Sequence, residues 1–367
     1  MNRSTATTSA AALRLPLIPL AALGLGGVFL AQPARAVQGF QGGAALCTGS
    51  LLPALFPFFV VCNLVASAPV SPGAGGLPRW LSKRCGLPSP AVPGLLLLSW
   101  LGGYAVCAGT VFRARQAGRI SAREAPLLLL LGCCSGPGFV IGCVGGQLLG
   151  SVPLGVLLYA LQLSANLLAA ALLLPFLPRA PAVAKPAPVP APKCPGSLLT
   201  AALSDAVDSS LCVCGCVIFF CIVAAVFAPL TGRLPGAVPF FSALLEISAG
   251  CRDFAALGGA AALYGISFCL SVLGLSVFAQ IQALAPGVLP PGLLAASRLL
   301  HLLWMQGLVR LCVRFLPGGA RVFSSLAPRV VLMNRLAPDA GLVLFLFLCA
   351  LLYRLHRLYR NGKKFYN

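Results

Sequence analysis

The chain has 367 residues, of which 26 are Lys or Arg and only six are Asp or Glu, so its formal charge is +20 at pH 7. Hydrophobic residues make up 59% of it, which excludes a soluble domain that could present this charge to a nucleic acid. The composition is that of a polytopic membrane protein, because carboxylates are costly in lipid and are excluded there.

Apolar windows recur along the whole chain, and a spanning helix needs about 20 mostly apolar residues. Several windows are interrupted by Gly and Pro. We therefore expect an all-α fold with about eight to ten membrane passes, some of them incomplete. The windows are Leu13–Ala31, Ala45–Ala66, Val92–Phe112, Leu127–Gly150, Leu154–Leu177, Leu211–Pro229, Ala255–Ala285, Leu293–Leu316 and Ala340–Tyr353 with its flanks.

The first 36 residues resemble a signal peptide, with Arg3 and Arg14 near an apolar stretch that Ala34-Arg35-Ala36 follows. The alternative is an uncleaved signal-anchor helix. We favour the anchor, because the apolar stretch is long for a signal peptide and an Arg just before the cleavage point is unusual.

Basic residues gather in two places, and the positive-inside rule assigns both to the cytoplasmic side. The segment Arg310–Arg335 carries five further Arg and conflicts with a single crossing between it and the tail. That segment is either a re-entrant pair or an amphipathic surface stretch. The two groups are Arg113, Arg115, Arg119 and Arg123 in one loop, and Arg354, Arg357, Arg360, Lys363 and Lys364 in the C-terminal tail.

A Pro-rich linker at residues 179–196 separates two transmembrane repeats, residues 37–178 and 197–316, and residues 317–367 form a C-terminal segment with a last helix and the basic tail. Each repeat has two interruptions of its apolar helices. From Tyr104 to Pro137 is 33 residues, and from Glu246 to Gly274 is 28. Paired interruptions predict an inverted repeat with broken helices and re-entrant hairpins, although glycines also serve close packing alone.

The interruptions are candidate substrate-binding positions, because the N-terminal end of a half-helix favours anions. Ser135, Gly136, Pro137 and Gly138 form one candidate tip. The other contains Gly274, Ser276 and Gln280. An interhelical hydrogen bond is the alternative role of Gln280.

Two ionisable residues in apolar helices are further candidates. Glu246 could bind a proton or a cation, or could pair with Arg252 or Arg298. Arg298 could recognise a carboxylate through its planar fork, or could extend to the membrane surface. His301 lies three residues after Arg298, on the same helix face.

We find no sign of an enzyme or of a cofactor. Nucleophile elbows, HExxH motifs and Walker A loops are absent from the sequence. Most of the 16 Cys lie in apolar runs, where Cys behaves as a small hydrophobe, and only two His are present. We expect no metal site, and we leave a homo-oligomer open.

Six stretches in order resemble the YlbJ/SpoVV-type sporulation integral membrane proteins, which belong to the nucleoside-recognition, or Gate, superfamily. The resemblance covers most of Ala45–Leu316. The stretches are SLLPALFPFFVV (Ser50–Val61), LGGYAVCAGTVFRARQAGRISAREA (Leu101–Ala125), CCSGPGFVIGCVG (Cys133–Gly145), LLEISAG (Leu244–Gly250), SVLGLSVFAQIQAL (Ser271–Leu284) and SRLLH (Ser297–His301).

This resemblance implies a fold like that of concentrative nucleoside transporters and transport of dipicolinic acid, a flat aromatic dianion, into the forming spore. The partners expected are then a small anionic substrate and membrane lipid, in a bacterial cell membrane. Two alternatives stay open. One is ion-coupled transport of a nucleoside, and the other is a membrane scaffold for spore envelope assembly that transports nothing.

Overall fold

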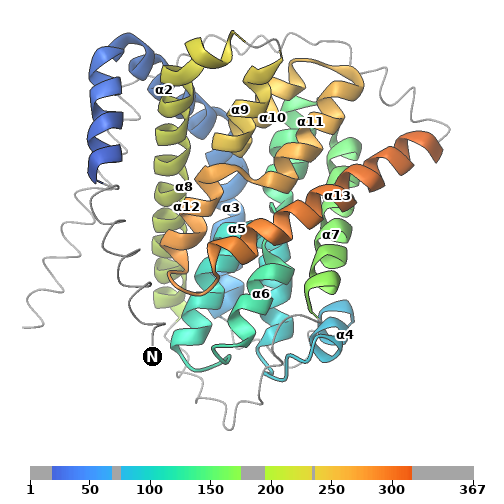
Figure 1. The fold of residues 1–367 in the computed structure, drawn as a ribbon. Helices are drawn as coiled ribbons and strands as arrows, with labels where there is room; N and C mark the ends of the chain where they lie inside the picture. Colours follow the sequence, from blue (N-terminus) through green and yellow to red (C-terminus); the bar gives the residue numbers. More distant parts are fainter. Residues whose placement is uncertain (1–18, 68–75, 175–194, 234–235, 316–367) are drawn as a thin grey trace, which may run out of the picture.

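The structure is a computed structural model that describes residues 19–67, 76–174, 195–233 and 236–315 (Figure 1). Every regular element in these ranges is a helix. The predicted C-terminal helix, the basic tail and nearly all of the Pro-rich linker lie outside the described residues, as does most of Arg310–Arg335.

The elements follow one another in two similar series. The first is an apolar helix at Pro19–Ala31, then α2 (Pro33–Leu46), the π-helix η1 (Cys47–Leu51), α3 (Leu52–Ser67), α4 (Leu77–Arg84), α5 (Val92–Gln116), α6 (Glu124–Gly132), the π-helix η2 (Gly138–Leu148) and α7 (Val152–Leu173). The second is α8 (Pro195–Thr231), α9 (Ala237–Leu245), α10 (Ile247–Ala255), α11 (Gly259–Val272), α12 (Gly274–Leu284) and α13 (Pro291–Phe315).

Six stretches of the described chain are long and apolar enough to cross a membrane, so the protein is an integral membrane protein by length and composition. The predicted window Leu127–Gly150 is not among them, because it divides into α6 and η2. The stretch that contains α2 runs on to Ala66 and begins at Pro33, so the expected boundary at residue 36 lies inside a helix. The six are Pro33–Ala66, Val92–Gln116, Val152–Leu173, Leu198–Thr231, Gly259–Leu284 and Pro291–Arg314.

The helix α5 folds back on itself at Gly103, whose φ of 77° and ψ of −173° are not helical. A straight helix of its 25 residues would be about 37 Å long. However, residues from both of its ends line one pocket, and Gly132 lies against both Ser99 and Cys107. Length and composition alone mark α5 as a membrane span, but its two arms form a hairpin.

The helices α9 and α10 form a second hairpin, with Glu246 at its tip. The backbone of Glu246 is extended, with φ −147° and ψ 124°, and it separates the two helices. The arms pack closely, since a Cβ added at Gly250 would lie 2.5 Å from the Cα of Ala243. Both arms lie at the end of the bundle opposite α4 (Figure 1).

Two glycines let α2 lie directly on α8. A Cβ added at Gly39 would lie 2.5 Å from the Cα of Ile222, and one added at Gly43 would lie 2.8 Å from the Cα of Ile218. Small residues four apart are the usual means of close helix approach in membranes, where burial gives no hydrophobic gain between helices.

A fully buried carboxylate holds the base of the α5 hairpin. Glu124 begins α6, and its two oxygens accept from the backbone N–H of Ser89 at 2.9 Å, from the Ser89 hydroxyl at 2.7 Å and from the Ser121 N–H at 2.7 Å. The Ser121 hydroxyl accepts in return from the Glu124 N–H at 3.2 Å, which completes a capping box. These bonds tie the loop before α5 to the loop after it.

Candidate functional site

The helix interruptions meet in pairs inside the bundle. In the first series, a Cβ added at Gly103 would lie 2.6 Å from the backbone nitrogen of Gly136. In the second, a Cβ added at Gly274 would lie 2.9 Å from the Ala243 carbonyl oxygen and 3.2 Å from the Glu246 nitrogen. Each hairpin tip therefore touches the break of the next transmembrane helix, where only glycine leaves room for the backbone.

Side chains of α7 donate hydrogen bonds to backbone carbonyls at two helix interruptions, the one in α5 and the one between α6 and η2. Asn166 donates to the carbonyls of Leu130 and Leu131 at 3.2 and 2.7 Å, at the end of α6. The Tyr159 hydroxyl donates to the carbonyl of Trp100 at 2.7 Å, beside the break in α5. Irregular backbone at membrane depth is tolerated only where protein or water satisfies it, and α7 does so here.

Arg298 reaches the same break from α13. It is 3% exposed, and it donates to the Cys133 carbonyl at 3.1 Å and to the Asn166 side-chain oxygen at 2.6 Å. It also donates to the Ser297 hydroxyl at 3.3 Å. The expected pairing with Glu246 is absent from the described contacts, and the burial of Arg298 excludes the alternative of extension to the membrane surface.

Three buried polar atoms next to this network have no hydrogen-bond partner among the described residues. They are the Ser135 hydroxyl oxygen, the Gln162 side-chain oxygen and Nδ1 of His301. Their residues are joined, because Gln162 donates to the Ser135 carbonyl at 2.8 Å and His301 Nε2 lies 3.1 Å from the Gln162 carbonyl. Buried polar atoms are normally paired, so this group of atoms needs a ligand or water.

Glu246 combines deep burial with an incomplete set of partners. It is 1% exposed, and its Oε2 accepts from the Ala249 N–H at 2.7 Å, which caps α10. Its Oε1 has no hydrogen-bond partner within the described part of the chain. Arg252 pairs with Asp253 instead, at 3.0 Å.

The break between α11 and α12 carries the only non-glycine residue with positive φ in the described chain. Leu273 has φ 66° and is fully buried. Such strain persists only where the surroundings enforce it, and it gathers at functional sites. Nearly two turns into α12, Gln280 donates to the Ser276 hydroxyl at 3.0 Å, while its own side-chain oxygen has no partner among the described residues.

The structure separates the predicted site residues into groups with different surroundings. Ser135 and Arg298 belong to the polar network on α7, while Glu246 and Gly274 form the second pair of breaks. Gly136 faces Gly103, whereas a Cβ added at Gly138 would lie 2.5 Å from the Ala54 carbonyl oxygen, so Gly138 allows η2 to pack on α3.

Three residues of the polar network were not among the predicted site residues: Gln162, Asn166 and His301. Polar side chains of one α7 face were a visible signal, since Tyr159, Gln162 and Asn166 recur at helical spacing. His301 shares its helix face with Arg298, and this face points toward α7.

The polar site residues are buried, since Ser135, Gln162, Arg298 and His301 are each at most 3% exposed. A cavity beside the first break, lined in part by Tyr104, Gly136 and Phe139, has a volume of about 10 Å³. This is enough for no more than one water. A substrate could reach these residues only after the tips have moved.

Comparisons with family models, with curated proteins and with solved structures gave no match to this chain.

Proposed function

We propose that the protein is a membrane transporter, or a permeation component, for a small anionic aromatic metabolite. The observation that carries this proposal is Arg298, a buried guanidinium at a junction of helix breaks with no carboxylate partner among the described residues. An uncompensated charge is costly at membrane depth, and such residues commonly mark a substrate path.

A carboxylate of the substrate would supply the missing negative charge. Arg298 uses three of its five N–H donors on Cys133, Asn166 and Ser297, so two remain. Of the unpaired atoms nearby, the Ser135 hydroxyl could donate a further hydrogen bond to this carboxylate, whereas the Gln162 oxygen and His301 Nδ1 are acceptors and would need a donor such as water. The free donors of Arg298 and Ser135 suit a flat acid such as dipicolinate, which the sequence resemblance also implies for a role in spore formation.

The inverted repeat of the concentrative nucleoside transporters is part of this proposal. A hairpin followed by an interrupted helix occurs once in each series of elements, and the hairpins α5 and α9–α10 lie toward opposite ends of the bundle (Figure 1). Under this arrangement the basic α5–α6 loop and the tail would both be cytoplasmic. Reagents applied from one side should label a Cys placed at Gly118, and reagents applied from the other side should label one placed at Leu257.

Glu246 favours a second candidate function, ion-coupled transport of a nucleoside. Its unpartnered Oε1 lies at a hairpin tip, where a bound cation or proton would complete its coordination. The two functions differ in what Arg298 does, because a neutral nucleoside has no charge for it to bind.

Uptake into proteoliposomes tests the proposal directly. Purified protein should accumulate labelled dipicolinate, and unlabelled dipicolinate should compete while a nucleoside should not. Arg298→Lys should raise the apparent KM for dipicolinate about tenfold, because Lys lacks the planar fork. Arg310→Gln, an exposed change on the same helix, is the matched control. Uptake of a nucleoside alone would favour the second function. If neither compound is taken up, the remaining alternative is a membrane scaffold that transports nothing.

A further inference from the structure

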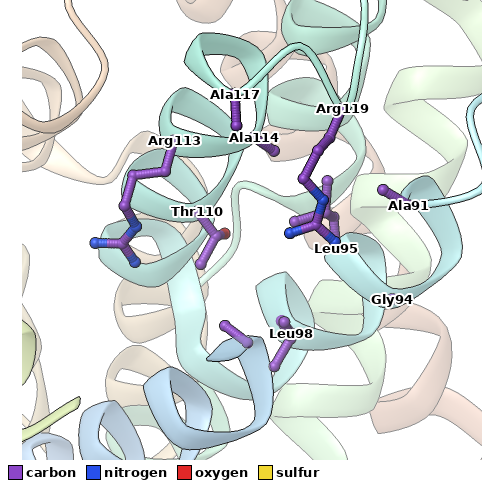
Figure 2. A pocket seen from close by; sticks show the side chains of 10 residues that line it. Ala91, Gly94, Leu95, Leu98, Thr110, Arg113, Ala114, Ala117 and Arg119 are labelled. Atoms are coloured by element: carbon purple, nitrogen blue, oxygen red, sulfur yellow. The ribbon is translucent and has the colours of Figure 1, made fainter. Parts of the chain in front are cut away.

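A cavity of about 210 Å³ lies at the open end of the α5 hairpin, away from the breaks described above (Figure 2). Its walls come from both arms of the hairpin, from Ala66 at the end of α3 and from the loop after α5. The cavity is lined by Ala66, Ala91, Gly94, Leu95, Leu98, Thr110, Arg113, Ala114, Ala117 and Arg119. At about 30 Å³ for each water-sized group, it has room for a charged headgroup and a short apolar segment.

Two arginines supply the charge of this cavity. Figure 2 shows the guanidinium groups of Arg113 and Arg119 on opposite sides of it, with Thr110 between them. Arg119 has no side-chain partner among the described residues. Arg113 is 3.4 Å from the Asn63 side-chain oxygen and makes a long ion pair of 3.5 Å with Asp205, whose side chain is 39% exposed. Asp205 is therefore an acid that competes with a ligand for Arg113.

The remaining wall is apolar. Ala66, Leu95 and Leu98 form it, and the Thr110 hydroxyl donates to the Val106 carbonyl at 2.6 Å rather than into the cavity. A freely hydrated ion would gain little from such a wall. Two cations above an apolar surface suit a ligand that has both an anionic group and a nonpolar portion.

We propose that this cavity binds the anionic group of an amphiphile, a phosphate or carboxylate held between Arg113 and Arg119 with its nonpolar portion against Leu95 and Leu98. The cavity lies at the end of the bundle where the α5–α6 loop and α4 are found (Figure 1), and α4 carries Arg79, Lys83 and Arg84. Anionic lipid headgroups are attracted to such clusters at the cytoplasmic surface. Because the ligand would bridge both arms of the hairpin, it would hold them together at their base.

Binding to the intact, delipidated protein tests this. Native mass spectrometry would count phosphatidylglycerol molecules retained against phosphatidylcholine, and inorganic phosphate would be titrated separately in detergent. Arg119→Gln should weaken phosphatidylglycerol binding about tenfold, as expected for loss of a charged hydrogen bond. Arg123→Gln, which removes an exposed Arg of the same loop, is the matched control. Asp205→Asn should strengthen binding, because it frees Arg113.

Each outcome of these binding experiments supports or overturns the proposed anion site. Selective retention of phosphatidylglycerol that is lost in Arg119→Gln and kept in Arg123→Gln supports a lipid as the source of the anion. Saturable phosphate binding with the same mutational pattern, without lipid selectivity, supports a soluble anion in the same cavity. Equal binding by both Arg variants, or no binding of either probe, overturns the proposal. No transport is measured, so the result is independent of the proposed function.

Discussion

Two buried carboxylates show how residues of one type acquire different roles. Glu124 is fully buried, and both of its oxygens are bonded to Ser89 and Ser121, so it has a structural task. Glu246 is equally buried, but its Oε1 has no partner. An unsatisfied buried acceptor costs about 1–3 kcal/mol, so Glu246 is the candidate of the two for a role beyond structure.

We predict that Glu246→Gln abolishes or strongly reduces transport while the protein still inserts. The amide keeps the size of the side chain and removes the charge that a proton or cation would need. Uptake assays and membrane fractionation measure the two effects. Asp253→Asn, at a partly exposed acid paired with Arg252, is the control and should leave uptake intact. Normal uptake by Glu246→Gln would remove this residue from the mechanism.

We predict that Arg298→Gln lowers the stability of the protein by about 1–3 kcal/mol, because it leaves the Cys133 carbonyl and the Asn166 oxygen without their charged donor. Asn166→Ala should cost a similar amount. The double variant should lose less than the sum, since both residues belong to one network. Thermal unfolding in detergent measures all three variants.

The same measurements distinguish the partners of Arg298. If Glu246 were its partner, Glu246→Gln would restore the stability lost in Arg298→Gln. The structure has these residues in different contacts, so we expect no rescue. Two results would contradict the hydrogen-bond network of Arg298 and Asn166. One is rescue of stability by Glu246→Gln, and the other is a double variant whose stability loss equals the sum of the losses in Arg298→Gln and Asn166→Ala.

At the scale of elements, glycines act in two ways that the sequence does not distinguish. Gly103 and Gly274 have positive φ and interrupt helices, whereas Gly39 and Gly43 lie in a regular helix and permit close packing. Both kinds occur in apolar runs. What differs is the neighbour, which is another backbone break in the first case and the side of α8 in the second.

We predict that Gly43→Leu lowers stability by about 1–3 kcal/mol, the usual cost of overpacking, because its side chain would displace α8 at Ile218. Gly42→Leu is the matched control, since nothing lies within 4 Å of a Cβ added there. Thermal unfolding of the two variants should differ clearly. Equal stability would show that α2 does not lie on α8 as described.

At the scale of the whole molecule, the two series of elements meet through side chains of α13. Arg298 and His301 belong to the second series but bond to residues of the first. Opening the site would require these bonds, or the contacts between tips and breaks, to rearrange. If the protein transports a substrate as proposed, that step would involve the interface of the two series.

We predict that Pro137 and Gly274 lie near each other inside the membrane. Cys pairs introduced at and around these two positions, in a chain cleared of its native Cys, should cross-link. A pair at Gly118 and Leu257, in loops assigned to opposite faces, serves as the negative control. Failure at every neighbouring pair, with cross-links to opposite faces instead, would contradict the arrangement.

Much of the helical fold could be predicted from the sequence, because apolar runs and Gly or Pro interruptions are local signals. The break at Gly103 and the extended Glu246 lie where the sequence predicted interruptions. The role of Glu124 could have been inferred from Ser121-Ala-Arg-Glu124, a capping-box pattern. The partners of Arg298 could not, because Cys133 and Asn166 lie 165 and 132 residues away along the chain.

The sequence by itself determined the class of protein and the positions of its breaks, since the cost of charge and of open backbone in lipid depends on local composition. Only the tertiary structure decided that α5 is a hairpin rather than a span, since length and apolarity are the same for both. It also decided which buried polar atoms have no partner, because hydrogen bonds between distant helices depend on packing that no single segment encodes.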